Sequence, residues 1–529
     1  METNRQINEK ILTQSIIRSG NPDKICKLGT MFHLGKGVEQ NYSKARIIYK
    51  IAADKGHGDS LYNLASMYIF GEGVEKNYDT ARELYEKASQ VGVVDAMLKL
   101  SEIYEEGIGC TIDYEKAYSF CKQALDKGNV SALTGLAMMY KNGHGVTQNM
   151  EKAIKLLKKS VQKKDDHAMY LLAKMYKNGD CVEQNEKRAI ILYKMAVDLG
   201  NSFAMNELAS IFVTYEKSKH PSVQDNYVTA RNLYERAIAL GNNDALYNLT
   251  ILCGCTLFDT EYYEKLHKLV LNGGDVRSTF ELSLMYQRGH GFVKDYAKSL
   301  ELFEHNVQLN DTNSMNELAI MYLLGQGTQK NEIKCVELLE KAVTLGDTNA
   351  LCNLANYYLH NGDPSQQSKA RQLLEKSVEL GEHKCLYMLA NICDQGKGGD
   401  VDYKTAFDLY QKAVSIGDAR AMNSLAIMYG SGHGVDVDYE KAKNLLEMSI
   451  EMGNPLAMYN LAFAYEQGFG VQQDYSKARE LYEKASEHGE TQSMLRLSEI
   501  YEQGKGIPVD SMKATEWQEK ADKFMTEPK

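Results

Sequence analysis

Cysteine and histidine are the residues of this chain with the clearest capacity for chemistry: its 529 residues include ten cysteines and twelve histidines. Zinc sites usually need two pairs of such residues at short spacing, and paired cysteines can also form disulfides. Cys253 and Cys255 lie two residues apart, but no second pair with zinc-like spacing accompanies them. The spacing of these residues therefore does not predict a metal site.

Three histidines lie between the glycines of short turns, as in Gly143-His144-Gly145. Other turns have a different residue between their two glycines, so this position does not require an imidazole. The residues there are Lys36, Glu72, Ile108, Gln326 and Phe469. A phosphate-binding loop would follow a strand and contain Gly-Lys-Ser/Thr, which these turns lack. No nucleophile elbow, zinc-protease or kinase motif is present. We expect no catalytic residue, metal or cofactor.

The glycine turns recur with a period of 36 residues, as at Gly37, Gly73, Gly109 and Gly145. The sequence ARELYEKAS occurs twice, at 81–89 and at 478–486, which indicates internal duplication. About fourteen units of 36 residues extend from residue 22 to residue 525. The high glycine count of 41 and the low proline count of 6 therefore reflect one repeated motif.

Each unit has the pattern of two helices. In 457–465 the first helix reads Ala-x-Tyr-x-Leu-Ala-x-Ala-Tyr, with apolar residues at helical spacing. A Gly-x-Gly turn ends it, because glycine adopts the left-handed conformation without steric cost. Asp474 is suited to cap the second helix, which we expect to end near Gly489. Small residues such as Ala65 and Ala81 would let neighbouring helices approach closely.

The spacing is irregular once, in the middle of the chain. An insertion falls around 217–224, which contains Pro221, and a deletion removes the glycine turn near 256–260. We therefore divide the chain into a capping helix at 1–21, repeats at 22–215, irregular repeats with a change of curvature at 216–274, and further repeats at 275–525. The capping helix would use Ile7, Ile11, Leu12 and Ile16, and Trp517 would cover the other end.

Composition limits the function further. The net charge of −10 argues against general binding to nucleic acid or to an acidic membrane. No apolar stretch reaches the roughly 20 residues needed to span a bilayer, so we expect no membrane insertion. The N-terminus lacks the apolar run of a secretory signal, which predicts a cytoplasmic protein.

The repeat alignment places most cysteines at core positions. Cys26 and Cys352 take the place of the first-helix tyrosine, while Cys335 and Cys385 take the place of alanines. A free cysteine behaves as a buried apolar residue at such positions. We therefore predict structural, reduced cysteines, and no cysteine pair recurs at the repeat period.

The helix pair with its Gly-x-Gly-Val turn, followed by Asp-Tyr-x-Lys-Ala-x-x-Leu-Tyr-x-Lys-Ala, resembles the Sel-one-like repeat (SLR) family over essentially the whole chain. Tetratricopeptide repeats share the design but have a period of 34 residues. The resemblance implies an all-α, right-handed α/α superhelical solenoid that serves as a non-catalytic scaffold or adaptor for partner proteins or peptides. Some bacterial members are cysteine-rich with regular disulfides and are linked to β-lactam hydrolysis. That hydrolytic enzyme is the disfavoured alternative.

A variable row of residues is the candidate partner-binding site. It occupies the third position of the first helix, and the seventh position varies on the same face. Large aromatic side chains and amides there suit peptide recognition in the solenoid groove. Packing against the next helix, or a structural asparagine ladder, would explain the same residues. The predicted contacts are Tyr62, Tyr170, Asn206, Tyr247, Phe280, Asn316, Tyr387, Asn423 and Tyr459.

Overall fold

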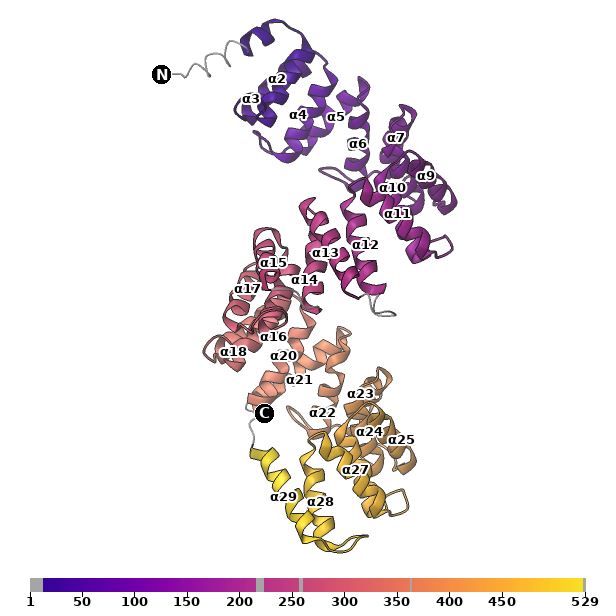
Figure 1. Cartoon of the computed structure of the whole chain (residues 1–529), viewed down its shortest axis with the longest axis vertical. Coiled ribbons are helices and arrows are strands. Elements are labelled where there is room, and N and C mark those ends of the chain that lie inside the picture. The colour runs from indigo at the N-terminus through magenta and orange to yellow at the C-terminus, as the bar shows by residue number, and fades with distance from the viewer. Residues whose placement is uncertain (1–12, 216–222, 256–259, 362–363, 527–529) are drawn as a thin grey trace. The chain divides into compact units, whose positions relative to one another are not determined.

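A computed structural model describes residues 13–215, 223–255, 260–361 and 364–526 of the chain. All regular secondary structure within these ranges is helical, and fourteen helix pairs follow one another (Figure 1). The all-helical repeat fold expected from the sequence is confirmed. Both helices expected for the seventh repeat, α14 and α15, are present although its sequence has lost the glycine turn.

The first helices of the pairs carry even numbers. They are α2 (Pro22–Leu34), α4 (Gly58–Phe70), α6 (Val94–Glu106), α8 (Ser131–Asn142), α10 (Asp166–Asn178), α12 (Ser202–Tyr215), α14 (Asn243–Cys255), α16 (Val276–Arg288), α18 (Thr312–Leu324), α20 (Thr348–Asn361), α22 (Leu386–Gln395), α24 (Ala419–Ser431), α26 (Pro455–Gln467) and α28 (Thr491–Gln503). A short 3₁₀ helix, η1 (His383–Cys385), precedes α22.

The second helices carry odd numbers. They are α3 (Tyr42–Ala53), α5 (Tyr78–Gln90), α7 (Tyr114–Asp126), α9 (Met150–Gln162), α11 (Glu186–Asp198), α13 (Val223–Ala239), α15 (Thr260–Gly273), α17 (Tyr296–Gln308), α19 (Glu332–Thr344), α21 (Pro364–Glu379), α23 (Tyr403–Ser415), α25 (Tyr439–Glu451), α27 (Tyr475–Glu487) and α29 (Ser511–Thr526).

The chain separates into two compact units. Unit 1 comprises Met1–Thr256 and Asn272–Gly274, and unit 2 comprises Leu257–Leu271 and Asp275–Lys529. The division therefore falls inside the segment 216–274 that the sequence marks as irregular. Residues 217–222 of the insertion and 256–259 of the deletion lie outside the described residues, and the change of curvature stays a prediction.

The expected helix ends are confirmed. Gly468 ends α26 with φ 75°, and Gly489 follows α27 with φ 80°. The side chain of Asp474 accepts hydrogen bonds from the backbone N–H groups of Ser476 and Lys477 at 3.0 and 3.1 Å. These caps satisfy backbone groups that a helix end leaves unpaired.

From the second repeat onward, the second glycine of a Gly-x-Gly turn also lets consecutive repeats approach closely. A Cβ added to Gly434, whose φ is 71°, would lie 2.8 Å from Cβ of Tyr403 at the start of the preceding second helix. A Cβ on Gly73 would lie 2.7 Å from the backbone carbon of Tyr42 in the same relationship. Glycine is therefore needed here for stacking as well as for its backbone conformation.

The core follows the repeat. Ala65 and Ala81 are both fully buried, as expected for close helix contacts. At the ends of the chain, Ile16 packs against the core of unit 1 and Trp517 packs against the last repeats of unit 2. Residues 13–18 are helical, but Ile7, Ile11 and Leu12 of the expected capping helix lie outside the described residues.

Candidate binding groove

A cleft of about 450 Å³ lies in unit 2 between the first helices α20 and α22 and the start of α24. Its walls carry third-position residues Cys352 and Tyr387 and seventh-position residues Asn356 and Asn391. The variable positions of consecutive first helices therefore line one cavity at this place. The remaining lining residues are Asn353, Leu359, His360, Met388, Ile392, Lys397 and Arg420.

The cleft combines apolar and polar side chains and has a basic edge. The guanidinium carbon of Arg420 lies 4.5 Å from the centre of the Tyr387 ring, and an Arg420 nitrogen lies 2.9 Å from a carboxylate oxygen of Asp418. These two contacts hold the guanidinium at the cleft. Asn356 and Asn391 contribute amides that can both donate and accept hydrogen bonds. An extended peptide backbone presents the complementary groups.

A second cleft, of about 360 Å³, lies between α24, α25 and α26 and is mainly apolar. Seventh-position residues Ile427 and Phe463 line it together with Phe469, which fills the middle of a Gly-x-Gly turn. The rings of Phe463 and Phe469 lie 6.0 Å apart. Such a cleft can hold an apolar side chain of a ligand.

Sequence reasoning did not single out the seventh-position residues of these clefts or Arg420. Variation at the seventh position was visible in the repeat alignment, so Asn356, Asn391 and Phe463 could have been named from it. Arg420 gave no such signal, because it belongs to the start of the following repeat and reaches the cleft only through stacking.

The aromatic residues of the predicted row are half-buried. Tyr62 contacts Tyr85 of the same repeat, with ring centres 5.4 Å apart, and burial raises the pKa of Tyr62. The equivalent pairs are Tyr170 with Tyr193 at 6.2 Å, Phe280 with Phe303 at 5.7 Å, Tyr387 with Tyr410 at 6.0 Å and Tyr459 with Tyr482 at 5.7 Å. One side of these rings thus packs on the second helix. Tyr247 is also half-buried.

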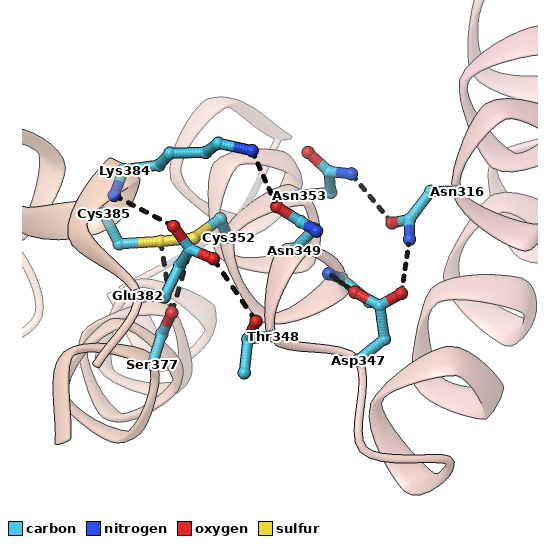
Figure 2. Close-up of a disulfide and its surroundings, with 11 residues drawn as sticks. Asn316, Asp347, Thr348, Asn349, Cys352, Asn353, Ser377, Glu382, Lys384 and Cys385 are labelled. Carbon is cyan, nitrogen blue, oxygen red and sulfur yellow. Dashed lines mark hydrogen bonds between the residues drawn. A yellow bond between two sulfur atoms is a disulfide. The ribbon is translucent and has the colours of Figure 1, made fainter. Parts of the chain in front are cut away.

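The asparagines of the row make contacts between repeats. Asn316, only 7% exposed, accepts a hydrogen bond from the amide nitrogen of Asn353 in the next repeat at 2.8 Å. Its own amide nitrogen donates to Asp347 at 3.3 Å (Figure 2). Asn206 and Asn423 accept from fourth-position asparagines in the same way, from Asn248 at 2.8 Å and from Asn460 at 2.7 Å.

These amides already have partners within the protein, which reduces what they can offer a peptide. The structure therefore distinguishes two kinds of residue in the row: asparagines that join repeats and aromatic residues that keep part of their surface open. Contact of either kind with a partner stays a prediction.

The prediction of reduced cysteines is wrong for one pair. Cys352 of α20 and Cys385 of η1 form a disulfide, with Cα atoms 6.0 Å apart, and Ser377 lies beside both sulfurs (Figure 2). The two residues belong to consecutive repeats, and stacking brings them together although 33 positions separate them.

Other cysteines fit the predicted core role. Cys121 and Cys335 are free and buried, and Cys253 is buried as well. Burial raises the pKa of Cys121 and Cys335 to about 11 and that of Cys253 to about 12. A thiol with such a pKa remains protonated near neutral pH and is a poor nucleophile.

Two of the turn histidines contact tyrosines. His144 stacks on Tyr114 with ring centres 4.1 Å apart and lies 2.9 Å from a carboxylate oxygen of Glu105, and His433 stacks on Tyr403 at 4.7 Å. Within the described ranges, no group of three or more histidine, cysteine or acidic side chains is arranged to hold a metal ion. No described helix combines the length and the apolar character needed to cross a membrane.

Comparison with known proteins identifies the repeat. The Sel1 repeat model matches thirteen segments: residues 25–57, 58–93, 94–129, 130–165, 166–201, 202–242, 276–304, 312–347, 348–382, 383–418, 419–454, 455–490 and 491–521. The chain belongs to the Sel1 repeat family. The unmatched segment between 242 and 276 is the seventh pair, in which the structure still has both helices.

Two solved structures of bacterial proteins are similar to this chain. The protective antigen c5321 of uropathogenic Escherichia coli, which displays an SLR fold, is 23% identical to this chain. The TM-score is 0.57, and the match covers 93% of this chain and 97% of the antigen. A Sel1 repeat protein from Oxalobacter formigenes is 28% identical, with a TM-score of 0.38 over 42% of this chain and 89% of its own. No curated protein sequence matches the chain.

Proposed function

We propose that this Sel1 repeat protein is a non-catalytic scaffold that binds extended peptide segments of partner proteins on the variable face of its first helices. The cleft between α20 and α22 carries the proposal, because third- and seventh-position residues converge there on a cavity of about 450 Å³. Asparagine amides would bind the peptide backbone, and Tyr387 with Arg420 would contact a side chain or a carboxylate.

The aromatic residues of the row extend this face along the repeats in each unit. Tyr62, Tyr170, Tyr247, Phe280 and Tyr459 would add contact area at low entropic cost, since each ring is already restrained by its surroundings. The proposed role of Asn206, Asn316 and Asn423 is to fix the spacing of the first helices that carry these rings. The apolar cleft at Phe463 would accept one apolar side chain of the ligand.

The hydrolytic alternative predicts a disulfide in each repeat. Cys352 and Cys385 are bonded, whereas Cys335 and Cys393 in the neighbouring helices are free. The described cysteines therefore favour the scaffold. Turnover of a chromogenic β-lactam by the purified protein above the uncatalysed rate would support the enzyme and contradict the scaffold.

Selection from a phage-displayed library of linear 12-residue peptides tests the groove. Peptides selected on the full chain are expected to bind the double variant Asn356→Ala/Asn391→Ala at least tenfold more weakly, in fluorescence anisotropy. Asn444→Ala is the matched control, because Asn444 is an exposed asparagine on the second helix α25. Failure to select any peptide, or equal binding to the double variant and the wild type, would overturn the proposal.

A further inference from the structure

Helix α9 has an unusual concentration of positive charge for a chain with a net charge of −10. The segment 150–164, which is α9 and the two residues after it, contains six lysines and one glutamate. Only Ala153, Leu157 and Ser160 of the helix are buried. The lysines are all exposed: Lys152, Lys155, Lys158, Lys159, Lys163 and Lys164.

Most of these lysines lack the counter-charge that is common on the other second helices. Lys443 pairs with Glu447 at 3.6 Å, and Lys484 pairs with Glu480 at 2.8 Å, one turn away in each case. Lys152 donates to the hydroxyl of Tyr140 at 2.6 Å. None of the other five lysines takes part in a salt bridge among the described residues. Like charges three or four residues apart destabilise a helix, so local stability does not explain this pattern.

Lys164 lies at a position where the backbone conformation disfavours any residue other than glycine. Its φ is 62°, in the left-handed region, where a side chain costs on the order of 1 kcal/mol relative to glycine. Most other repeats place a glycine at the equivalent position: Gly56, Gly92, Gly128, Gly200, Gly241, Gly346, Gly381, Gly417, Gly453 and Gly489. The fourth repeat therefore has a lysine where the fold prefers glycine.

The charge extends to the neighbouring second helices. Lys122 of α7, Lys158 of α9 and Lys194 of α11 are exposed and lie five residues after the buried alanine of their helix. Most other repeats have glutamate there, with Lys50 and Gln411 as exceptions, and Glu304 and Glu340 accept hydrogen bonds from the hydroxyls of Tyr322 and Tyr358 in the next repeat. Three consecutive repeats thus replace a structurally useful glutamate by lysine.

An apolar stripe follows in the next repeat. Lys155, Lys159 and Lys163 of the α9 segment are equivalent to Ile191, Met195 and Leu199 of the α11 segment. These three apolar side chains are 57%, 41% and 49% exposed and lie four residues apart, which places them on one face. Both helices pack against α10. Unit 1 therefore presents a row of lysines and a row of apolar side chains at the same helix positions of consecutive repeats.

We propose that this surface, called the α9–α11 surface, docks an amphipathic helix of a partner protein that has an acidic edge and an apolar face. The carboxylates of the partner helix would pair with Lys155, Lys159 and Lys163. Apolar residues of the partner helix, spaced three or four apart, would cover Ile191, Met195 and Leu199. The surface lies on second helices, so it is separate from the proposed peptide groove on the first helices.

The observations favour a protein over other anionic partners. The chain's net negative charge opposes the approach of a long polyanion or an acidic bilayer, because such a partner would also meet the acidic parts of the surface. A single partner helix is small enough to contact only the basic region. The α9 segment has no aromatic side chain to stack on nucleic-acid bases. The apolar stripe contains no Trp, Tyr or Phe of the kind that favours a membrane interface.

An 18-residue amphipathic peptide of glutamate and leucine, labelled with fluorescein, is the probe. Fluorescence anisotropy with the full chain is expected to show binding that weakens between 50 and 500 mM salt, because exposed charges are screened. The variants Lys155→Glu/Lys159→Glu/Lys163→Glu and Ile191→Ser/Met195→Ser/Leu199→Ser should each lose at least tenfold in affinity. These side chains are exposed, and circular dichroism would verify that both variants fold.

The matched control is Lys341→Glu/Lys376→Glu/Lys412→Glu. These lysines are exposed and occupy the helix position of Lys159 in three repeats of unit 2, so their reversal should leave binding unchanged. Equal losses in the control and in the α9 variant would overturn the proposal. The proposal would also be overturned if the wild-type chain bound phosphatidylserine vesicles or single-stranded RNA more tightly than it binds the peptide, and if the α9 variant lost that binding. Salt-sensitive dimerisation through the same lysines, measured by sedimentation, would instead assign the surface to a second copy of the chain.

Discussion

The amide nitrogen of Asn460 donates a hydrogen bond to Oδ1 of Asn423 at 2.7 Å and thereby joins the first helices of consecutive repeats. Asn353 and Asn316 are related in the same way at a separation of 37 residues. Asn248 and Asn206 make the same bond across 42 residues. The insertion inside the sixth repeat therefore leaves the first helices of the sixth and seventh repeats in register.

The asparagine pair is expected to contribute measurably to stability. Asn460→Ala leaves the buried Asn423 oxygen without its donor, which costs about 1–3 kcal/mol, and a double-mutant cycle with Asn423→Ala should give a coupling of about 1 kcal/mol. Urea denaturation measures both quantities. Asn356→Ala, at an exposed asparagine of α20, is the control and should change stability little. A coupling near zero would mean that the bond does not hold the repeats together.

Substitutions of two turn glycines can distinguish the cost of backbone strain from the cost of a steric clash. Gly453 has φ 81° and nothing within 4 Å of an added Cβ, so Gly453→Ala should cost about 1 kcal/mol through strain alone. Gly434→Ala adds a clash with Tyr403 and should cost about 1–3 kcal/mol more. Thermal denaturation of the two variants tests the difference, and equal losses would contradict close stacking at this turn.

Aspartate caps make stability depend on pH. Hydrogen bonds from backbone N–H groups hold the pKa of Asp113, Asp402 and Asp438 below the usual 3.8. A lowered pKa in the folded state means that this stabilisation is present above about pH 4 and is lost as pH falls through the folded pKa. The triple variant to asparagine keeps the caps but should show a smaller fall in melting temperature between pH 6 and pH 3.

The converse substitution provides the control for the pH experiment. Asn77 already caps α5 through a hydrogen bond from the backbone N–H of Thr80. Asn77→Asp should therefore increase the acid sensitivity of the chain. An unchanged pH profile in both variants would show that cap ionisation contributes nothing measurable.

The disulfide predicts a difference in thiol count. The denatured, unreduced protein should react with two fewer equivalents of a thiol reagent than the reduced protein, and Cys352→Ser/Cys385→Ser should remove that difference. Reduction should lower wild-type stability by about 2–4 kcal/mol and leave the double variant unaffected. Cys181→Ser, at an exposed free cysteine, should respond to reduction as the wild type does. Equal counts before and after reduction would contradict the bond.

Local features of the repeat could be predicted from the sequence because they depend on short segments. The period, the two helices, the caps such as Asp474 and the left-handed glycines such as Gly468 follow from propensities within about twenty residues. The seventh pair could also be recognised without its glycine turn, because the apolar spacing of its helices remains.

Contacts between repeats were decided by the tertiary structure. The sequence placed Asn316 and Asn423 in a row but could not show that asparagines of the following repeat would bond them, or that Cys352 would meet Cys385. The candidate groove likewise combines Tyr387 with Arg420 of the next repeat. Such partners lie about one repeat apart, and their distance depends on how the helices stack, which a pattern within one repeat does not determine.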